Sequence, residues 1–204
     1  MKKKSLFITA TNTDVGKTYA AQKLLVKYAN EGYKVGYYKP IETGVTNQPH
    51  DGSELLELTQ ILNPQFTVNI NDVVPYQFSL PAAPFVAKQN THINIKFLMQ
   101  QRDFLMNFCD ILIVEGAGGL MVPLESNYFM IDMIKEFNCD ENILISSSKL
   151  GSINDTLLSM EALKRRNIAF KWYVNLHIDR ESYEQVTLPY YKEVFKNILY
   201  INDI

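Results

Sequence analysis

Short apolar runs alternate with longer amphipathic segments along most of this chain of 204 residues. Each apolar run has the length of a buried strand, and each amphipathic segment has apolar residues at helical spacing. Strands that alternate with helices predict an α/β domain, in which right-handed crossovers place helices on both faces of a parallel sheet. We expect strands at 5–10, 34–39, 110–115, 142–146, 169–176 and 198–202, and helices at 17–32, 53–62, 94–108, 128–137, 152–167 and 189–197.

The stretch from 63 to 92 breaks this rhythm. Prolines at 64, 75, 81 and 84 punctuate it, and proline disfavours regular structure, so we expect it to be irregular. Elsewhere the chain has no internal repeat, linker or low-complexity tract. We therefore expect a single domain that spans residues 1–204.

The composition excludes several classes of function. The net charge is −2, and no basic block follows Lys2–Lys4, which argues against nucleic-acid binding by phosphate neutralisation. No segment approaches the roughly twenty apolar residues of a membrane span, and the first apolar run is too short for a signal peptide. We expect a soluble, cytoplasmic protein with no nucleic-acid or membrane partner. Cys109 and Cys139 lie beside apolar segments and form no CxxC pair, so buried free thiols are expected.

The loop after the first strand, ATNTDVGKT at 10–18, has the elements of a phosphate-binding loop. Gly16 permits close approach of the backbone, Lys17 can reach the outer phosphates, and Thr18 offers a hydroxyl to Mg²⁺. The strict pattern requires a glycine at position 11, where this chain has Thr11. Its place between a strand and a helix still predicts a phosphate site.

Two further loops carry charged residues where strands end. Lys39, in YKPIETG at 38–44, ends the second strand and is expected to face the same crevice as Lys17, from an adjacent strand. Glu115 closes the apolar strand and opens the glycine-rich segment EGAGG. A carboxylate at this place suits Mg²⁺, and the glycines suit close approach to a ligand. Since ligands of such sheets bind outside the carboxyl ends of the strands, we expect the three loops to form one site.

The last two loops carry weaker signals. Gly151 and Ser152 begin a helix whose free amide groups suit an anion, although the same residues are ordinary helix caps. Asn175 follows a strand and can present its amide to a base edge, although asparagine is equally common in turns. The three histidines, His50, His92 and His177, are scattered and are expected in loops or on the surface.

These loops together resemble the dethiobiotin synthetase family along nearly the whole chain. The resemblance runs through ATNTDVGKT, YKPIETG, VEGAGGLMVPL, KLGSIND and YVN, in the order and at the spacing typical of that family. The most specific part is VEGAGG after KPxxTG, because most phosphate-loop ATPases carry neither. The family's own loop also accounts for the missing glycine at position 11, although its first glycine is replaced here by Ala10.

The resemblance implies a P-loop NTPase-type fold, a homodimer with active sites at the subunit interface, and a dependence on Mg²⁺. It implies that ATP drives the joining of CO₂ to 7,8-diaminononanoate, giving dethiobiotin, ADP and phosphate. Lys17 and Lys39 are implied to be catalytic, and Thr18, Asp51 and Glu115 to bind the metal. The residues implied to bind ATP are Asp14, Val15, Gly16, Lys17, Thr18, Tyr19, Asp51, Glu115, Gly116, Ala117, Gly118, Asn175 and Leu176. Those implied to bind the substrate are Thr13, Lys39, Thr43, Gly151, Ser152 and Asn154, the last three across the dimer interface.

Two features depart from the family pattern. Asp51 is assigned only by its place in HDGSELLEL, before the second helix, where other acids lie nearby. The family's late Gly-x-Ile-Pro segment has no recognisable counterpart before Ile204, so we expect looser recognition of the nucleotide base.

Three other classes of P-loop protein share parts of this pattern. A partitioning or cell-division ATPase is the nearest alternative, but that class has an early lysine where this chain has Thr11 and Asn12. A cobyrinate-type amidotransferase needs a glutaminase domain, for which the chain is too short. A GTPase should show Asn-Lys-x-Asp after its fifth strand, whereas the chain has Asn175–Ile178 with the sequence NLHI.

Overall fold

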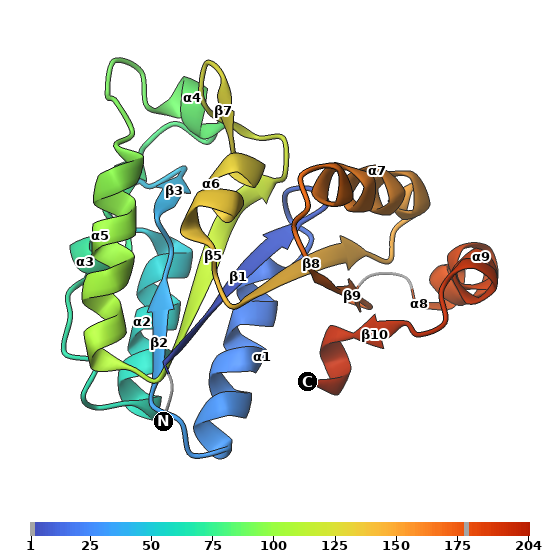
Figure 1. Ribbon diagram of the computed structural model, residues 1–204, viewed down its shortest axis with the longest axis horizontal. Coiled ribbons are helices and arrows are strands. Elements are labelled where there is room, and N and C mark those ends of the chain that lie inside the picture. Colours follow the sequence, from blue (N-terminus) through green and yellow to red (C-terminus); the bar gives the residue numbers. More distant parts are fainter. Residues whose placement is uncertain (1–2, 178–179) are drawn as a thin grey trace.

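A computed structural model describes residues 3–177 and 180–204 and contains a six-stranded sheet in the order β10-β9-β8-β1-β5-β2 (Figure 1). All five neighbouring pairs in this sheet are parallel, as predicted. Its strands are β1 (Lys4–Ala10), β2 (Val35–Tyr38), β5 (Ile111–Gly119), β8 (Glu141–Ser147), β9 (Lys171–Asn175) and β10 (Leu199–Tyr200).

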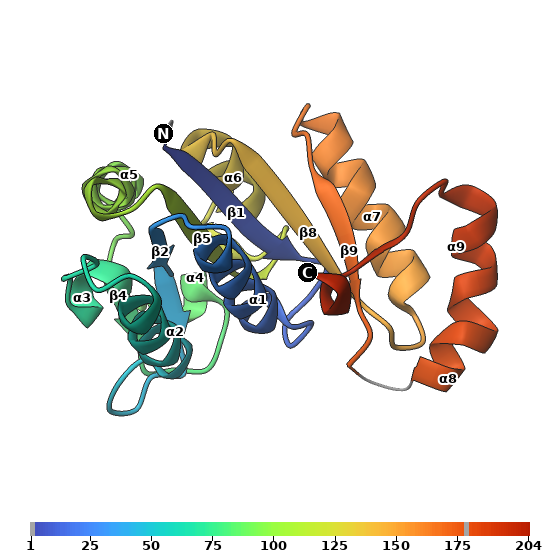
Figure 2. The same cartoon turned by 90° about the horizontal axis from the view of Figure 1, so that it is seen from below.

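Helices cover both faces of the sheet. Helices α1 (Lys17–Asn30) and α2 (His50–Leu62) lie on one face (Figures 1 and 2). The opposite face is covered by α5 (Ile95–Leu105), α6 (Met130–Phe137) and α7 (Ser152–Arg165). The central strand β1 is therefore buried from Ser5 to Ala10, and burial of each large apolar side chain contributes roughly 1.5–3 kcal/mol.

The sheet order corrects one expectation. Strands β1 and β2, which precede Lys17 and Lys39, are not adjacent, because β5 pairs with both and lies between them. The chain crosses from β1 to the edge strand β2 and then returns to β5. Strand β5, which carries Glu115, therefore lies between the strands that lead to the two lysine-bearing loops.

The stretch from 63 to 92 is more regular than expected. It contains α3 (Ile70–Val73), β4 (Tyr76–Phe78) and α4 (Pro84–Ala87), and β4 pairs in parallel with β3 (Ile41–Thr43). A capping box at Asn69 starts α3, and these elements are too short to give a periodic signal in the sequence.

Other boundaries also differ from the prediction. Helix α2 begins at His50 rather than at residue 53, directly after Pro49. Strand β5 continues to Gly119, so Glu115 lies within a strand and not in a loop. The chain then forms a short antiparallel hairpin of β6 (Pro123–Glu125) and β7 (Tyr128–Phe129) before α6. A 3-10 turn at Met106–Phe108 extends α5.

The C-terminal segment packs beside β9 and matches the predicted helix and strand only in part. It consists of α8 (Arg180–Ser182), a π-helical turn (Tyr183–Thr187), α9 (Leu188–Val194), β10 and a final 3-10 turn (Ile201–Asp203). The Trp172 ring of β9 lies 4.9 Å from the Tyr191 ring and 4.8 Å from the Phe195 ring, measured between centroids. This aromatic contact attaches the segment to the sheet.

Two further expectations can be compared with the structure. Cys109 and Cys139 are free and buried, as predicted. Within the described ranges, the helices all lack the length and apolar character that a bilayer crossing requires.

Candidate active site

The loop between β1 and α1 has the backbone of an anion-binding site. Asp14 and Gly16 both have positive φ, 56° and 99°, so the chain turns sharply just before α1. A Cβ at Gly16 would lie 2.1 Å from Nδ2 of Asn175, which leaves no room for any other residue there. Gly16 caps α1 without a side chain, so the first amide groups of the helix stay available to an anion.

Lys17 is a buried cation beside this loop. Its side chain is 8% exposed, and Nζ donates only a long hydrogen bond of 3.5 Å to the carbonyl of Asn12. Burial lowers the pKa of Lys17 below its ordinary value, although the charge of Glu115 partly opposes that effect. In the described ranges no ion pair joins Lys17 to a carboxylate within 4.0 Å. A buried ammonium group in this setting favours an anionic ligand such as phosphate.

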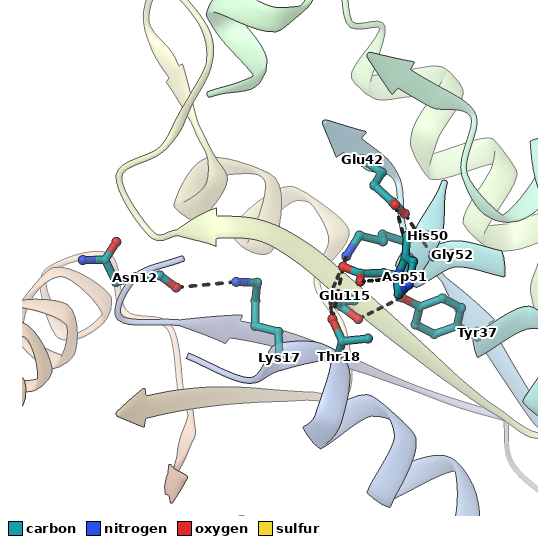
Figure 3. A network of polar contacts seen from close by, with 10 residues as sticks. Asn12, Lys17, Thr18, Tyr37, Glu42, His50, Asp51, Gly52 and Glu115 are labelled. Carbon is teal, nitrogen blue, oxygen red and sulfur yellow. Dashed lines mark hydrogen bonds and ion pairs between the residues drawn. The ribbon is translucent and has the colours of Figure 1, made fainter. Parts of the chain in front are cut away.

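Four side chains from α1, α2, β5 and the end of β2 meet beside the loop (Figure 3). Lys39 Nζ lies 2.8 Å from Asp51 Oδ2 and 2.7 Å from Glu115 Oε1. The Thr18 hydroxyl lies 3.3 Å from the same Asp51 oxygen and 2.9 Å from the same Glu115 oxygen. Two carboxylate oxygens therefore contact one ammonium group, and the threonine hydroxyl contacts both of those oxygens.

A second set of contacts holds Glu115 and the start of α2. The Tyr37 hydroxyl donates to the other oxygen of Glu115, Oε2, at 2.8 Å. The Glu42 carboxylate accepts from the backbone amides of Asp51 at 3.2 Å and Gly52 at 3.0 Å. Glu42 thereby caps the start of α2, where Pro49 offers no side-chain cap. Tyr37 therefore holds the carboxylate of Glu115, and Glu42 holds the backbone that carries Asp51.

The charges in this cluster determine what Lys39 can do. Burial alone would lower the pKa of Lys39, but Glu115 and Asp51 outweigh it and raise the pKa well above its ordinary value. Burial alone would raise the pKa of Asp51. The charge of Lys39 and the hydrogen bonds to the Asp51 carboxylate outweigh burial, so the pKa of Asp51 is lowered. A lysine with a raised pKa is suited to stabilising anions and not to accepting a proton.

A cavity of about 360 Å³ lies at the centre of these groups. The predicted site residues that line it are Thr13, Asp14, Gly16, Lys17, Thr18, Lys39, Thr43, Asp51, Glu115, Gly116, Ala117 and Gly118. A larger cleft of about 780 Å³ lies at the opposite end of β8 and β9. There Lys171 pairs with Glu141 at 2.7 Å, and Arg166 lies 3.5 Å from Asp132, so these cations already have partners. The smaller cavity is therefore the better candidate for an active site.

Similar proteins of known name identify the family of this chain. An ATP-dependent dethiobiotin synthetase BioD of Sulfurovum sp. strain NBC37-1 is 52% identical over 192 residues, which cover 94% of this chain and 91% of the relative. The enzyme of the same name from Wolinella succinogenes is 38% identical, with 93% and 89% covered. The chain belongs to the dethiobiotin synthetase family. It is accordingly an enzyme, a ligase of biotin biosynthesis.

Two broader comparisons agree with the fold. A family model described as an AAA domain matches residues 4–177. A plasmid partition protein from Borrelia burgdorferi superposes with a TM-score of 0.60 at 14% identity, covering 98% of this chain and 89% of that one. MinD from Aquifex aeolicus gives 0.56 at 16% identity, covering 96% and 80%. At such low identity these neighbours show the P-loop α/β fold alone, which this synthetase-family chain shares with partitioning ATPases.

Some of the predicted residues lie outside the cavity. Val15 is buried behind the phosphate loop, and Tyr19 and Leu176 are partly exposed. Gly151 and Asn154 are exposed at the start of α7, and Ser152 is buried there. The roles given to these residues by the family resemblance stay predictions.

Asn175 has a contact that was not expected. Its side chain is 1% exposed, and Nδ2 donates to the carbonyl of Val15 at 2.9 Å. Its amide oxygen has no hydrogen-bond partner in the described part of the chain. The Asn175 side chain therefore holds the backbone of the phosphate loop. Its recognition of a nucleotide base stays a prediction.

Four residues near the site were missed. Ile41, Glu42 and His177 line the cavity, and Tyr37 contacts Glu115. A signal for Tyr37 existed, because residues two apart in a strand share a face, and Lys39 follows it by two. No feature of the sequence indicated Glu42, since its contacts with the start of α2 depend on the tertiary structure.

The donor set fits a hard divalent cation. Mg²⁺ prefers oxygen ligands, and the Thr18 hydroxyl contacts one carboxylate oxygen of Asp51 and one of Glu115. In the described ranges no three histidine, cysteine or acidic side chains are arranged so that they could hold a metal ion by themselves. A metal held here would thus depend on the threonine hydroxyl, water and phosphate oxygens as well as on the two carboxylates.

Proposed function

We propose that this synthetase uses ATP to join CO₂ to 7,8-diaminononanoate, with the cavity beside the phosphate loop as its active site. The observation that supports this most directly is the cluster of Lys39, Thr18, Asp51 and Glu115 at the mouth of that loop. It places a buried cation and a hard-cation donor set where the outer phosphates of ATP would lie.

The reaction needs three bond-forming steps. One substrate amine attacks CO₂ and loses a proton, which gives a carbamate. A carbamate oxygen then attacks the γ-phosphorus of ATP, and ADP leaves, which gives a carbamic–phosphoric anhydride. The second amine attacks the carbonyl carbon of this anhydride and loses a proton, and phosphate leaves as the ureido ring closes. Every step creates or carries anionic oxygen, and no step requires a nucleophile from the protein.

The side chains act on that charge. Lys17 and the free amide groups at the start of α1 hold the phosphates. Lys39, which stays an ammonium group, stabilises the oxygens of the carbamate and of the transferred phosphoryl group. Thr13 and Thr43 line the same cavity and position the diamine. The contribution of the protein is electrostatic and geometric.

Mg²⁺ is the metal we propose for Thr18, Asp51 and Glu115. Bound there, it would neutralise charge on the phosphate oxygens. The carboxylates of Asp51 and Glu115 would supply the negative charge that the protein brings to the metal. Tyr37 holds the Glu115 carboxylate, and Glu42 holds the backbone amide of Asp51.

We further propose that two copies of the chain form a homodimer through the surface beside α7. Large apolar side chains are exposed there: Leu150 is 84%, Leu158 59% and Met121 52% exposed. Leu158 and Met121 also line a groove of about 360 Å³ between α7 and the end of β5. Exposed apolar clusters of this kind mark protein interfaces.

The dimer would also explain where the tail of the substrate binds. Gly151, Ser152 and Asn154 lie outside the cavity of their own chain, yet the family resemblance assigns them to the substrate. The amide groups at the start of α7 suit a carboxylate. We therefore propose that they bind the tail carboxylate in the site of the partner subunit. Because ATP is a substrate, we place the enzyme in the cytoplasm.

Substrate dependence of ATP turnover tests the function. We expect ADP release to require both diaminononanoate and bicarbonate, with dethiobiotin formed in equal amount. A chain with Lys17→Ala, purified in the same way, controls for contaminating ATPases. ATP hydrolysis that is indifferent to both compounds would instead favour a partitioning-type ATPase.

A further inference from the structure

Tyr37 contacts the active site without lining its cavity. Its ring lies on β2 and is fully buried, and its hydroxyl donates to Glu115 Oε2 at 2.8 Å (Figure 3). The other oxygen of the same carboxylate, Oε1, contacts Thr18 and Lys39. The two oxygens of Glu115 are thus divided between the interior of the protein and the active site.

The strand register explains why Tyr37 can reach Glu115. Tyr37 on β2 is paired with Ile113 on β5, two residues before Glu115. Since residues two apart in a strand point to the same face, Tyr37, Lys39 and Glu115 share one face of the sheet. The length of the tyrosine ring carries its hydroxyl forward to the carboxylate.

The division of the oxygens has a chemical consequence. A carboxylate with one oxygen anchored cannot rotate, so it presents a single oxygen, Oε1, to a cation in the cavity. The Tyr37 hydroxyl anchors the oxygen on the far side, Oε2, as a hydrogen-bond donor.

We propose that Tyr37 is a positioning residue for the metal: it orients Glu115 so that one carboxylate oxygen faces the metal site. The proposal rests on the proposed function, because it takes Glu115 as a metal ligand. Groups that orient metal ligands from behind commonly change metal affinity by about 10–100-fold when removed.

The matched control is the next residue of the same strand. Tyr38 is also fully buried, and its hydroxyl donates to the carbonyl of Leu98 at 3.0 Å, away from the cluster. Tyr37→Phe and Tyr38→Phe each remove one buried hydroxyl and keep the ring. A purely structural role for Tyr37 predicts the same behaviour for both variants.

The experiment measures Mn²⁺ binding to the whole chain in the presence of a saturating non-hydrolysable ATP analogue, by electron paramagnetic resonance. We expect Tyr37→Phe to bind Mn²⁺ roughly tenfold more weakly than the wild type, as for other orienting groups, and Tyr38→Phe to match the wild type. In turnover assays, Tyr37→Phe should raise the Mg²⁺ concentration for half-maximal rate and largely keep kcat at saturating Mg²⁺. Thermal unfolding of both variants should show a comparable loss of stability.

Two results would overturn the proposal, and they are distinguishable. If Tyr37→Phe and Tyr38→Phe bind Mn²⁺ equally well while Glu115→Gln binds it poorly, Glu115 is a ligand that does not need Tyr37. If Glu115→Gln binds Mn²⁺ as well as the wild type, the metal role of Glu115 is wrong and Tyr37 has no ligand to position.

Discussion

Lys39 and Glu115 form an ion pair of 2.7 Å in which neither side chain is exposed by more than 6%. The Glu115 oxygen in this pair is also the one that contacts the Thr18 hydroxyl. Asp51 also pairs with Lys39, and its side chain is 39% exposed. The Lys39 ammonium thus contacts the two carboxylate oxygens that we propose as metal ligands. If these oxygens bind a metal, we expect Lys39 to move away from the carboxylates.

The first prediction concerns this exchange. Lys39→Met should lose about 3 kcal/mol of stability in EDTA, because a buried carboxylate is left without its counter-ion. Since a ligand that binds only the folded state stabilises it, millimolar Mg²⁺ should restore much of that loss. Thermal unfolding with EDTA and with Mg²⁺ measures both effects.

Lys17→Met is the control for the exchange. It removes a buried ammonium group from the same cavity, but one that forms no ion pair in the described ranges. We expect a smaller loss in EDTA and little recovery with Mg²⁺. Equal recovery in the two variants would mean that Lys39 does not compete with the metal.

Turnover should depend on both lysines. Each of Lys17→Ala and Lys39→Ala should reduce kcat by about a hundredfold or more, since one donor to a developing oxyanion is commonly worth roughly 3–4 kcal/mol. Dethiobiotin formation at saturating substrates measures this, and circular dichroism confirms folding. Activity near the wild-type level in folded Lys39→Ala would remove Lys39 from the catalytic groups.

Substitution of the proposed metal ligands should change how turnover depends on the Mg²⁺ concentration. Glu115→Gln and Asp51→Asn should each raise the Mg²⁺ concentration needed for half-maximal rate, because each removes one charge from the oxygen donor set. Glu54→Gln is the matched control, since Glu54 is exposed on the same helix as Asp51. A larger effect for Glu54 than for Asp51 would show that the wrong acid of α2 has been assigned.

The two cysteines should be unreactive in the native protein. Burial raises the pKa of the Cys109 thiol to about 12 and that of Cys139 to about 11, and the thiolate is the reactive form. We expect Ellman's reagent to modify neither thiol at neutral pH and both after unfolding in guanidinium chloride. Rapid modification of the native protein would mean that one of the buried regions opens readily.

The sequence predicted the parts of the fold whose signals are local. Strand β1, helix α1 and the loop between them were predictable, because an apolar run, a helical period and a glycine-lysine pair occur within a few residues. Strands β3 and β4 were missed because each has three residues and no period can be read from so few.

The site was predictable residue by residue but not as an arrangement. Lys17, Lys39 and Glu115 were expected near one another and do line one cavity. The pairing of Lys39 with Glu115 was not, since it depends on β5 lying between β1 and β2. The spacing of two residues places Tyr37 on the face of Lys39, but its contact with Glu115 depends on strand register. The contacts of Glu42 depend on the docking of α2, which neither composition nor spacing reveals.

The last prediction tests whether each active site combines two chains. Asn154 is exposed at the start of α7, outside the cavity of its own chain, so Asn154→Ala should weaken diaminononanoate binding much more than ATP binding. Asn154→Asp adds a negative charge where we place the tail carboxylate and should inactivate the enzyme. Mixing it with inactive Lys17→Ala subunits should restore some activity, because one site of a mixed dimer then has both an intact phosphate loop and an intact tail pocket. Proven subunit exchange with no recovery would mean that each site is built within one chain.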